Sequence, residues 1–359
     1  MRIIVATFLA CLLLPGAEPP TAEIGNGQIK AKLYLPDAVN GFYRSTRFDW
    51  SGVVASLKYK GHNFYGPWFY RVDPGVYDLG YDQKGVISAP FTAMVGPAEE
   101  FGTDGAALGF AEAEPGGTFI KIGVGVLRKP RAGEPAVPAR PPAQGGASVP
   151  VAPDRYDHSR TYTLVDSGKW TVKKKRDSVE FTQELHDPAD GYAYIYRKVI
   201  RLVPAKPQMV IEHSLKNIGQ KTIRSTVYNH NFFVLDGEGP SRNLTITVPF
   251  PIVSPRPPTA GLLEVQGNQL TYLKTLANED RATAAIQGFG DTAKDYDIRV
   301  ENKKSGAGVR IQGDQPITRI VYWSIRTTLC PEAYITMEVP PGKQSKWTYT
   351  YTFYDTRGK

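Results

Sequence analysis

Cysteine is scarce in this 359-residue chain, which carries only Cys11 and Cys330. Cys11 lies in an N-terminal segment with the features of a secretory signal peptide: a positive charge at Arg2, an apolar core over 3–14 and small residues that end at Ala17. Cleavage near Ala17 leaves Cys330 as the only cysteine, which excludes an intramolecular disulfide. The sequence therefore predicts a secreted or periplasmic protein, with lipid attachment at Cys11 as the alternative.

Further absences narrow the class of protein. No apolar segment after the signal peptide is long enough to cross a bilayer, so we expect no membrane span. No stretch combines a clean 3.6-residue apolar period with helix caps, which disfavours a helical fold. The net charge is +8, but the basic residues are spread along the chain without a zinc-finger spacing or a phosphate-binding glycine loop. We therefore expect no nucleic-acid partner, no metal and no cofactor.

The chain is rich instead in turn formers and aromatic residues, with 35 glycines, 29 prolines, 20 tyrosines and 15 phenylalanines. Apolar and polar residues alternate with a period of two over 29–35, 53–59 and 347–353, as they do in half-buried strands. Many short strands separated by turns are typical of a β-sandwich or a barrel. The sequence thus predicts an all-β protein.

The same patterns suggest how the chain is divided. Residues 1–17 form the signal peptide, and residues 18–28 form a short polar leader. Residues 29–355 form a single domain, because β-type alternation continues on both sides of a segment at 129–153. That segment is rich in proline, alanine and glycine and has almost no aromatic residues to pack into a core, so it is predicted to be a long surface loop.

Four segments then form a recognisable series. They are 48–57 followed by Gly61, the strand-like segment 209–217, the run Asn229-His230-Asn231-Phe232-Phe233 within 226–235, and Pro331-Glu332-Ala333 followed by Pro341-Gly342. In order and spacing, these segments resemble the galactose mutarotase-like (aldose 1-epimerase) superfamily over about 29–353. The resemblance implies a large antiparallel β-supersandwich with a sugar cleft on the concave face of one sheet. It also implies an isomerase that interconverts sugar anomers by opening the sugar ring.

Two residues are the predicted catalytic pair. The resemblance assigns the general acid to the histidine of the motif, His230, while a carboxylate on the opposite side of the sugar takes the proton of the anomeric hydroxyl. The family's glutamate falls at Arg326 in this chain, so Glu332 is the nearest carboxylate. Each residue also has a structural alternative: a core histidine bonded to a backbone carbonyl, and a turn residue after Pro331.

Further residues are predicted to contact the sugar, since pockets for sugars combine aromatic rings with a few fixed polar groups. For Arg47 and Asp49 the alternative is ion pairing within the sheet. For Glu100 the alternative is a solvated turn, and for Trp323 it is core packing. The guanidinium at position 326 would suit an acidic sugar, because its planar fork binds carboxylates. The set comprises Arg47, Asp49, Glu100, Asn229, Trp323 and Arg326.

Three functions stay open, because function depends on the site and not on the fold. The first is an aldose 1-epimerase-like isomerase acting on a small sugar or oligosaccharide, either neutral or acidic. The second is a non-catalytic carbohydrate-binding protein in which Arg326 lies opposite His230 with no carboxylate. The third is a relative of polysaccharide lyases or hydrolases that uses His230 or Tyr228 in a long groove.

Overall fold

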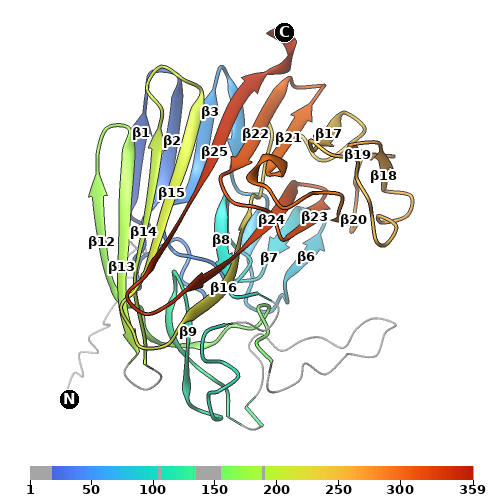
Figure 1. The fold of residues 1–359 in the computed structure, drawn as a ribbon. Coiled ribbons are helices and arrows are strands. Elements are labelled where there is room, and N and C mark those ends of the chain that lie inside the picture. Colours follow the sequence, from blue (N-terminus) through green and yellow to red (C-terminus); the bar gives the residue numbers. More distant parts are fainter. Residues whose placement is uncertain (1–17, 104–106, 132, 135–154, 188–190, 359) are drawn as a thin grey trace, which may run out of the picture.

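The computed structural model describes residues 18–103, 107–131, 133–134, 155–187 and 191–358 (Figure 1). These residues form 25 β-strands and two short 3-10 helices, Ala293–Asp295 and Thr356–Gly358, and no α-helix occurs among them. None of their helices is long and apolar enough to cross a membrane. The predicted signal peptide and most of the predicted loop at 129–153 lie outside the described residues.

The largest sheet has ten antiparallel strands, all from residues 169–355. Strand β25 (Gln344–Asp355) has the period-two burial that the sequence predicted over 347–353, with inward aromatic residues and outward threonines. In sheet order the strands are β12 (Lys169–Lys174), β13 (Ser178–Asp187), β14 (Tyr192–Leu202), β15 (Gln208–Asn217), β25 (Gln344–Asp355), β22 (Ala307–Gly313), β21 (Asp297–Asn302), β17 (Leu244–Thr247), β19 (Gln269–Tyr272) and β18 (Leu263–Gln266).

A five-stranded antiparallel sheet carries the histidine motif. Its strands, in order, are β20 (Arg281–Ile286), β23 (Arg319–Ile325), β24 (Thr328–Val339), β16 (Ile223–His230) and β8 (Ala98–Phe101). Residues 326–327 connect β23 to β24, and β16 ends at His230. This sheet joins segments far apart in the sequence, since β8 and β16 are separated by more than a hundred residues and still pair directly.

Three smaller sheets complete the described part of the chain, and in one of them the strands β5 and β7 pair in parallel. The sequence predicted a polar leader over 18–28, but Thr21–Gly25 form a strand that pairs with Ile29–Tyr34 and buries Ala22 and Ile24. The first small sheet comprises β1 (Thr21–Gly25), β2 (Ile29–Tyr34), β3 (Val53–Tyr59) and β4 (His62–Tyr65). The second comprises β11 (Thr163–Asp166), β10 (Gly125–Arg128) and β9 (Thr118–Lys121). The third comprises β5 (Arg71–Val72), β7 (Gly85–Ser88) and β6 (Leu79–Asp82).

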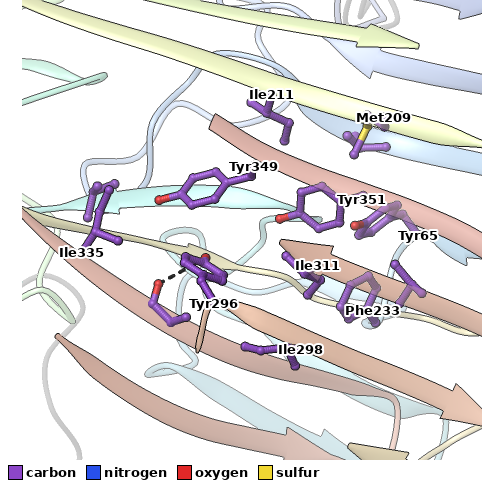
Figure 2. Close-up of a cluster of buried hydrophobic side chains, with 14 of the residues drawn as sticks. Tyr65, Met209, Ile211, Phe233, Tyr296, Ile298, Ile311, Ile335, Tyr349 and Tyr351 are labelled. Carbon is purple, nitrogen blue, oxygen red and sulfur yellow. Dashed lines mark hydrogen bonds between the residues drawn. The ribbon is translucent and has the colours of Figure 1, made fainter. Parts of the chain in front are cut away.

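One continuous hydrophobic core contains side chains of both large sheets. Figure 2 shows part of it, which includes Ile211 and Tyr351 of the ten-stranded sheet and Ile335 of the five-stranded sheet. Burying one such large side chain stabilises the fold by about 1.5–3 kcal/mol. The core occupies one face of the five-stranded sheet, so the opposite face is left to form a site.

Candidate active site

A cavity of about 410 Å³ lies on this opposite face of the five-stranded sheet. Val227 belongs to the core between the large sheets, and successive side chains of a strand point to opposite faces, so Tyr228 and His230 point to the cavity. Of the residues that the sequence proposed, the structure brings five together in the cavity lining: His230, Glu332, Arg47, Glu100 and Trp323.

Strand register fixes one row of polar side chains across the cavity wall. In this row Glu100 of β8 pairs with Tyr228 of β16, Tyr228 with Tyr334 of β24, and Tyr334 with Arg319 of β23. The rings of Tyr228 and Tyr334 stack, with their centres 4.2 Å apart. The row therefore places a carboxylate at one end, two stacked phenols in the middle and a guanidinium at the other end.

His230 and Glu332 lie beside this row, each two residues along its strand from a stacked tyrosine. Nε2 of His230 is 3.2 Å from Oε1 of Glu332, and both side chains are only 8% exposed. Burial raises the pKa of Glu332 to about 8, and burial lowers the pKa of His230 well below its usual value. Near neutral pH the proton between them therefore resides on Glu332, and the imidazole is neutral.

This geometry differs from the one predicted from the sequence. His230 and Glu332 were expected on opposite sides of a sugar, but a separation of 3.2 Å leaves no room for one between them. The position of the proton also differs from the one expected, because the carboxyl carries it and the imidazole nitrogen that faces the carboxyl has the lone pair. The two residues form one acid–base unit on a single wall of the cavity.

Cys330 contacts the other edge of the same imidazole ring. Its Sγ lies 2.8 Å from Nδ1 of His230 and accepts a hydrogen bond from the backbone N–H of Phe232 at 3.1 Å. Since Nε2 faces the protonated Glu332, the neutral ring carries its hydrogen on Nδ1 and directs it at this sulfur. Burial also raises the pKa of the Cys330 thiol well above its usual value, so the sulfur stays protonated.

His230, Cys330 and Glu332 offer a nitrogen, a sulfur and an oxygen within 4.8 Å of one another, a donor set that zinc accepts. The imidazole, however, presents Nδ1 to the sulfur and Nε2 to the carboxyl, which lie at different edges of the ring. A single ion could use only one of these nitrogens, so the contacts present suit proton transfer better than metal binding.

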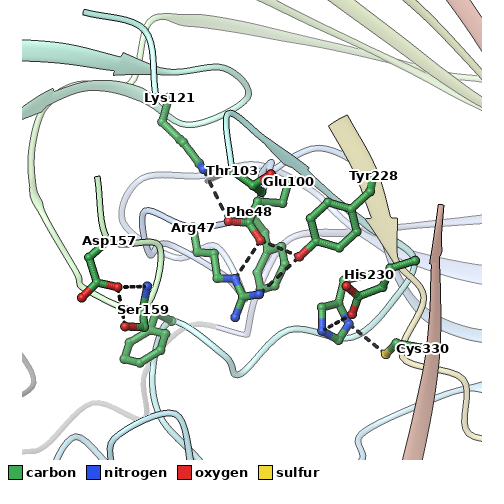
Figure 3. A network of polar contacts seen from close by, with 12 residues as sticks. Arg47, Phe48, Glu100, Thr103, Lys121, Asp157, Ser159, Tyr228, His230 and Cys330 are labelled. Carbon is green, nitrogen blue, oxygen red and sulfur yellow. Dashed lines mark hydrogen bonds and ion pairs between the residues drawn. The ribbon is translucent and has the colours of Figure 1, made fainter. Parts of the chain in front are cut away.

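Glu100 lies at the centre of a second polar cluster in the cavity (Figure 3). It accepts hydrogen bonds from Nε of Arg47 at 2.9 Å and from the Tyr228 hydroxyl at 2.6 Å, and Nζ of Lys121 lies 3.5 Å from its other oxygen. Burial opposes ionisation of Glu100, but Arg47 and Lys121 lower its pKa to about 2. Glu100 is therefore ionised while Glu332 is protonated, and two carboxyls with such different pKa values can take different roles.

Aromatic side chains hold the histidine and wall the cavity. Phe232 has a φ of 42°, in the left-handed region that phenylalanine rarely adopts. This turn folds its ring back over His230, with ring centres 3.8 Å apart, and Trp68 stacks on Phe232 at 5.4 Å. Trp323 meets the His230 ring edge-on at 5.5 Å. These rings fix the imidazole and give the cavity apolar walls.

The remaining three proposed residues lie outside the cavity lining. Asp49 is buried behind the site, where it accepts hydrogen bonds from Ser51 at 2.6 Å and Tyr196 at 3.0 Å. Asn229 is 1% exposed and points to the face opposite His230, as its position in the strand requires. Arg326 lies in the β23–β24 connection, with its guanidinium carbon 5.2 Å from the centre of the Tyr81 ring.

Sequence reasoning missed several lining residues. Tyr334 follows Glu332 by two positions in a strand, so period-two alternation alone would place both on one face. Arg319 and His158 also line the cavity, but only the strand pairing and the packing of the 155–160 segment bring them there. Lys121 stands behind Glu100, a position that the sequence does not signal.

Comparisons with known proteins identify the fold. No family model and no curated protein matches the chain. Among the solved structures that match, a galactose mutarotase-like protein from Clostridium acetobutylicum has a TM-score of 0.52 and 11% identity, with 95% of this chain and 97% of that chain covered. A galactose mutarotase related enzyme from Lactobacillus acidophilus has a TM-score of 0.51 and 11% identity, with 94% of this chain and 98% of that chain covered. A GalM/aldose epimerase homologue from C. elegans has a TM-score of 0.50 and 14% identity, with 94% of this chain and 99% of that chain covered. The chain has the galactose mutarotase-like fold, which confirms the predicted fold class; identities this low show the fold alone.

Proposed function

We propose that this protein is a mutarotase that interconverts the anomers of a small aldose, with Glu332 as general acid and His230 as general base. The observation that carries the proposal is the 3.2 Å contact between these two side chains in a cavity walled by aromatic rings. Their pKa values are shifted so that one holds a proton and the other can accept one near neutral pH.

An acid and a base that touch each other suit this reaction. Ring opening requires a proton on the ring oxygen O5 and removal of a proton from the hydroxyl oxygen O1, and both oxygens are bonded to the same carbon, C1. Glu332 gives its proton to O5 as the C1–O5 electron pair moves to O5. Nε2 of His230 takes the O1 proton, and the O1–H electron pair forms the C1–O1 double bond.

The open-chain aldehyde then turns about its C1–C2 bond and presents its other face. The O5 hydroxyl adds to C1, its proton returns to Glu332, and His230 returns its proton to O1. The transient imidazolium and carboxylate are adjacent, so the charges that form attract each other. No net proton, electron or co-reactant is consumed in the cycle.

Two features support a small sugar over the alternatives. The cavity volume of about 410 Å³ lies at the small end of ligand pockets, which span roughly 300–1,000 Å³. The binding-protein alternative required Arg326 opposite His230, and Arg326 instead contacts Tyr81. With the predicted signal peptide, we propose that the reaction takes place outside the cytoplasm.

The proposal is tested by NMR exchange spectroscopy of α and β anomers with wild type, Glu332→Gln and His230→Gln. General acid–base catalysis contributes about 10²–10⁴-fold, so each substitution is expected to slow exchange by at least about 100-fold. Glu338→Gln is the matched control, since Glu338 is on the same strand with 57% of its side chain exposed. Wild-type exchange in Glu332→Gln would overturn the proposal.

A further inference from the structure

A basic groove of about 350 Å³ lies on the outer face of the four-stranded sheet β1–β4. The inner face of this sheet packs on the hydrophobic core through side chains such as Ala22, Leu33 and Leu57, so the alternate residues of its strands point outward. The charged residues that line the groove are Lys30 and Lys32 of β2, Lys58 of β3, Arg176 of the β12–β13 turn and Glu23 of β1.

Two of these lysines face each other directly across the sheet. Lys30 pairs in register with Lys58, and both residues are exposed. Like charges directly opposite each other destabilise a sheet, whereas opposite charges stabilise it. Arg224 and Glu338, which are also direct partners, show the stabilising arrangement with an ion pair of 2.8 Å. Core packing demands lysine at neither exposed position, so the repulsion between Lys30 and Lys58 calls for another explanation.

The charge of the basic groove is largely unneutralised within the protein. None of the acidic residues that the structure describes forms an ion pair with Lys30, Lys58 or Arg176. Glu23 is the direct partner of Lys32 in the strand pairing, so it offsets at most one of the four positive charges. Neighbouring strands lie about 4.8 Å apart, so one ligand that crosses them contacts several of the remaining cations. The groove therefore fits a ligand with several negative charges.

A second groove, of about 1090 Å³, continues the basic groove along the same sheet. The two grooves share Ser56 and Lys58, and the second one adds Lys60 and Arg357, of which Arg357 faces Asp355. The second groove alone exceeds the active-site cavity of about 410 Å³. The joined surface thus suits a polymer better than a single small anion.

The lining of the two grooves disfavours nucleic acid and membrane as partners. Proteins that hold single-stranded nucleic acid stack its bases on aromatic rings, and Tyr65, the one aromatic residue among the described lining residues, is buried. Membrane-surface segments insert apolar side chains, and none of the exposed large hydrophobic residues in the described part of the chain lies on β1–β4. An acidic polysaccharide needs neither feature, because its charges are spread along a hydrated chain.

We propose that the basic groove binds an acidic polysaccharide, whose carboxylates lie against Lys30, Lys58 and Arg176. This surface is separate from the active-site cavity, since the two share no lining residue. Binding there holds the protein beside a polymer and leaves the cavity open. The proposal does not depend on the mutarotase reaction.

Biolayer interferometry tests the proposal with two forms of one polymer: polygalacturonate, and its methyl ester, which has the same backbone without the charge. We expect wild type to bind polygalacturonate, to release it as NaCl rises from about 0.05 to 0.5 M, and not to bind the ester. Lys30→Gln/Lys58→Gln should weaken binding by about five- to tenfold, the loss expected for two exposed ion pairs. Lys216→Gln/Lys346→Gln, which removes two exposed lysines of the ten-stranded sheet, is the charge-matched control and should bind as wild type does.

Three results of this experiment would overturn the proposal. The first is equal binding of the methyl ester, and the second is an equal loss of affinity in the control variant. The third is tighter binding of duplex DNA or of phosphatidylglycerol vesicles than of polygalacturonate, because the partner would then belong to another class.

Lys58→Glu tests whether the repulsion between the two lysines serves binding. The new carboxylate lies opposite Lys30, so urea unfolding should show a protein at least as stable as wild type, while the affinity for polygalacturonate falls further than in Lys30→Gln/Lys58→Gln. Wild-type affinity in Lys58→Glu would overturn the proposal. Anomer exchange of free sugars should be unchanged in this variant, because Lys58 does not line the cavity. Failure of wild type to exchange anomers would refute the mutarotase proposal and leave the binding result standing.

Discussion

Replacing Glu332 by glutamine is expected to change how the stability of the protein depends on pH. In the folded protein, burial raises the pKa of this carboxyl from 4.5 to about 8, whereas in the unfolded chain it titrates near 4.5. Between these values the folded state binds one more proton, so its contribution to stability is complete below pH 4.5 and is lost as pH rises to 8.

The size of the effect follows from the same shift. Each pH unit in this range costs roughly 1.4 kcal/mol, so wild type should lose roughly 1.5–2 kcal/mol relative to Glu332→Gln between pH 6.5 and 8. Glutamine has nearly the same shape and does not titrate. Comparing the two proteins cancels the contributions of other titrating groups, and above pH 6.5 the histidines of the unfolded chain are mostly neutral.

Urea unfolding at several pH values between 6.5 and 8, followed by tryptophan fluorescence, measures this difference directly. The free energy of unfolding of wild type should fall toward that of Glu332→Gln, or below it, as the pH rises. Glu338→Gln serves as control, since its exposed carboxyl should leave the wild-type slope unchanged. If the curves of wild type and Glu332→Gln run parallel, Glu332 is not protonated in the folded state, and the assignment of the acid is refuted.

Three further predictions concern the site and its support. The anomer-exchange rate should fall as pH rises through about 8, where Glu332 loses its proton; a flat kcat/KM profile from pH 6 to 9 would contradict this. Cys330→Ala should slow anomer exchange and shift the His230 ring from the Nδ1–H tautomer toward the Nε2–H tautomer. The ¹⁵N chemical shifts of the ring distinguish the two tautomers. An Nε2–H tautomer in the wild-type protein would contradict the placement of the hydrogen on Nδ1. Lys198→Met should destabilise the protein by roughly 3–5 kcal/mol in urea unfolding, because it leaves the buried Glu99 without its cation; a loss below 1 kcal/mol would show that the pair contributes little.

The fold was accessible from the sequence, because alternation of apolar residues has the same period as a strand and the four segments occur in the order of one family. The end of β24 illustrates this, since the Pro-Gly turn and the aromatic strand after it lie where the pattern predicted them. The strand at Thr21–Gly25 was missed because five residues with two buried side chains give too short a pattern to recognise. Its partner in the sheet, not its own sequence, makes it a strand.

The two residues that we propose as the catalytic pair could be named from the sequence, but the distance between them could not. His230 and Glu332 are separated by about a hundred residues, and only the pairing of β16 with β24 brings them into contact. Their pKa shifts follow from burial, which no local pattern records. Asn229 could have been set aside by period-two alternation, because a neighbour of His230 in a strand must point to the other face.

Glu99 and Glu100 are adjacent residues of β8, and their side chains point to opposite faces of the sheet. Glu99 points inward, to Lys198 and His213, while Glu100 points to the cavity, to Arg47 and Lys121. A substitution at position 100 therefore changes the charge of the pocket and leaves Arg47 and the buried Lys121 without their carboxylate, whereas a substitution at position 99 removes the carboxylate that faces Lys198 and His213 in the interior. One short strand thus supplies a carboxylate to each of two buried charge clusters, one in the interior and one in the cavity wall, so a substitution at either position is expected to alter stability as well as charge.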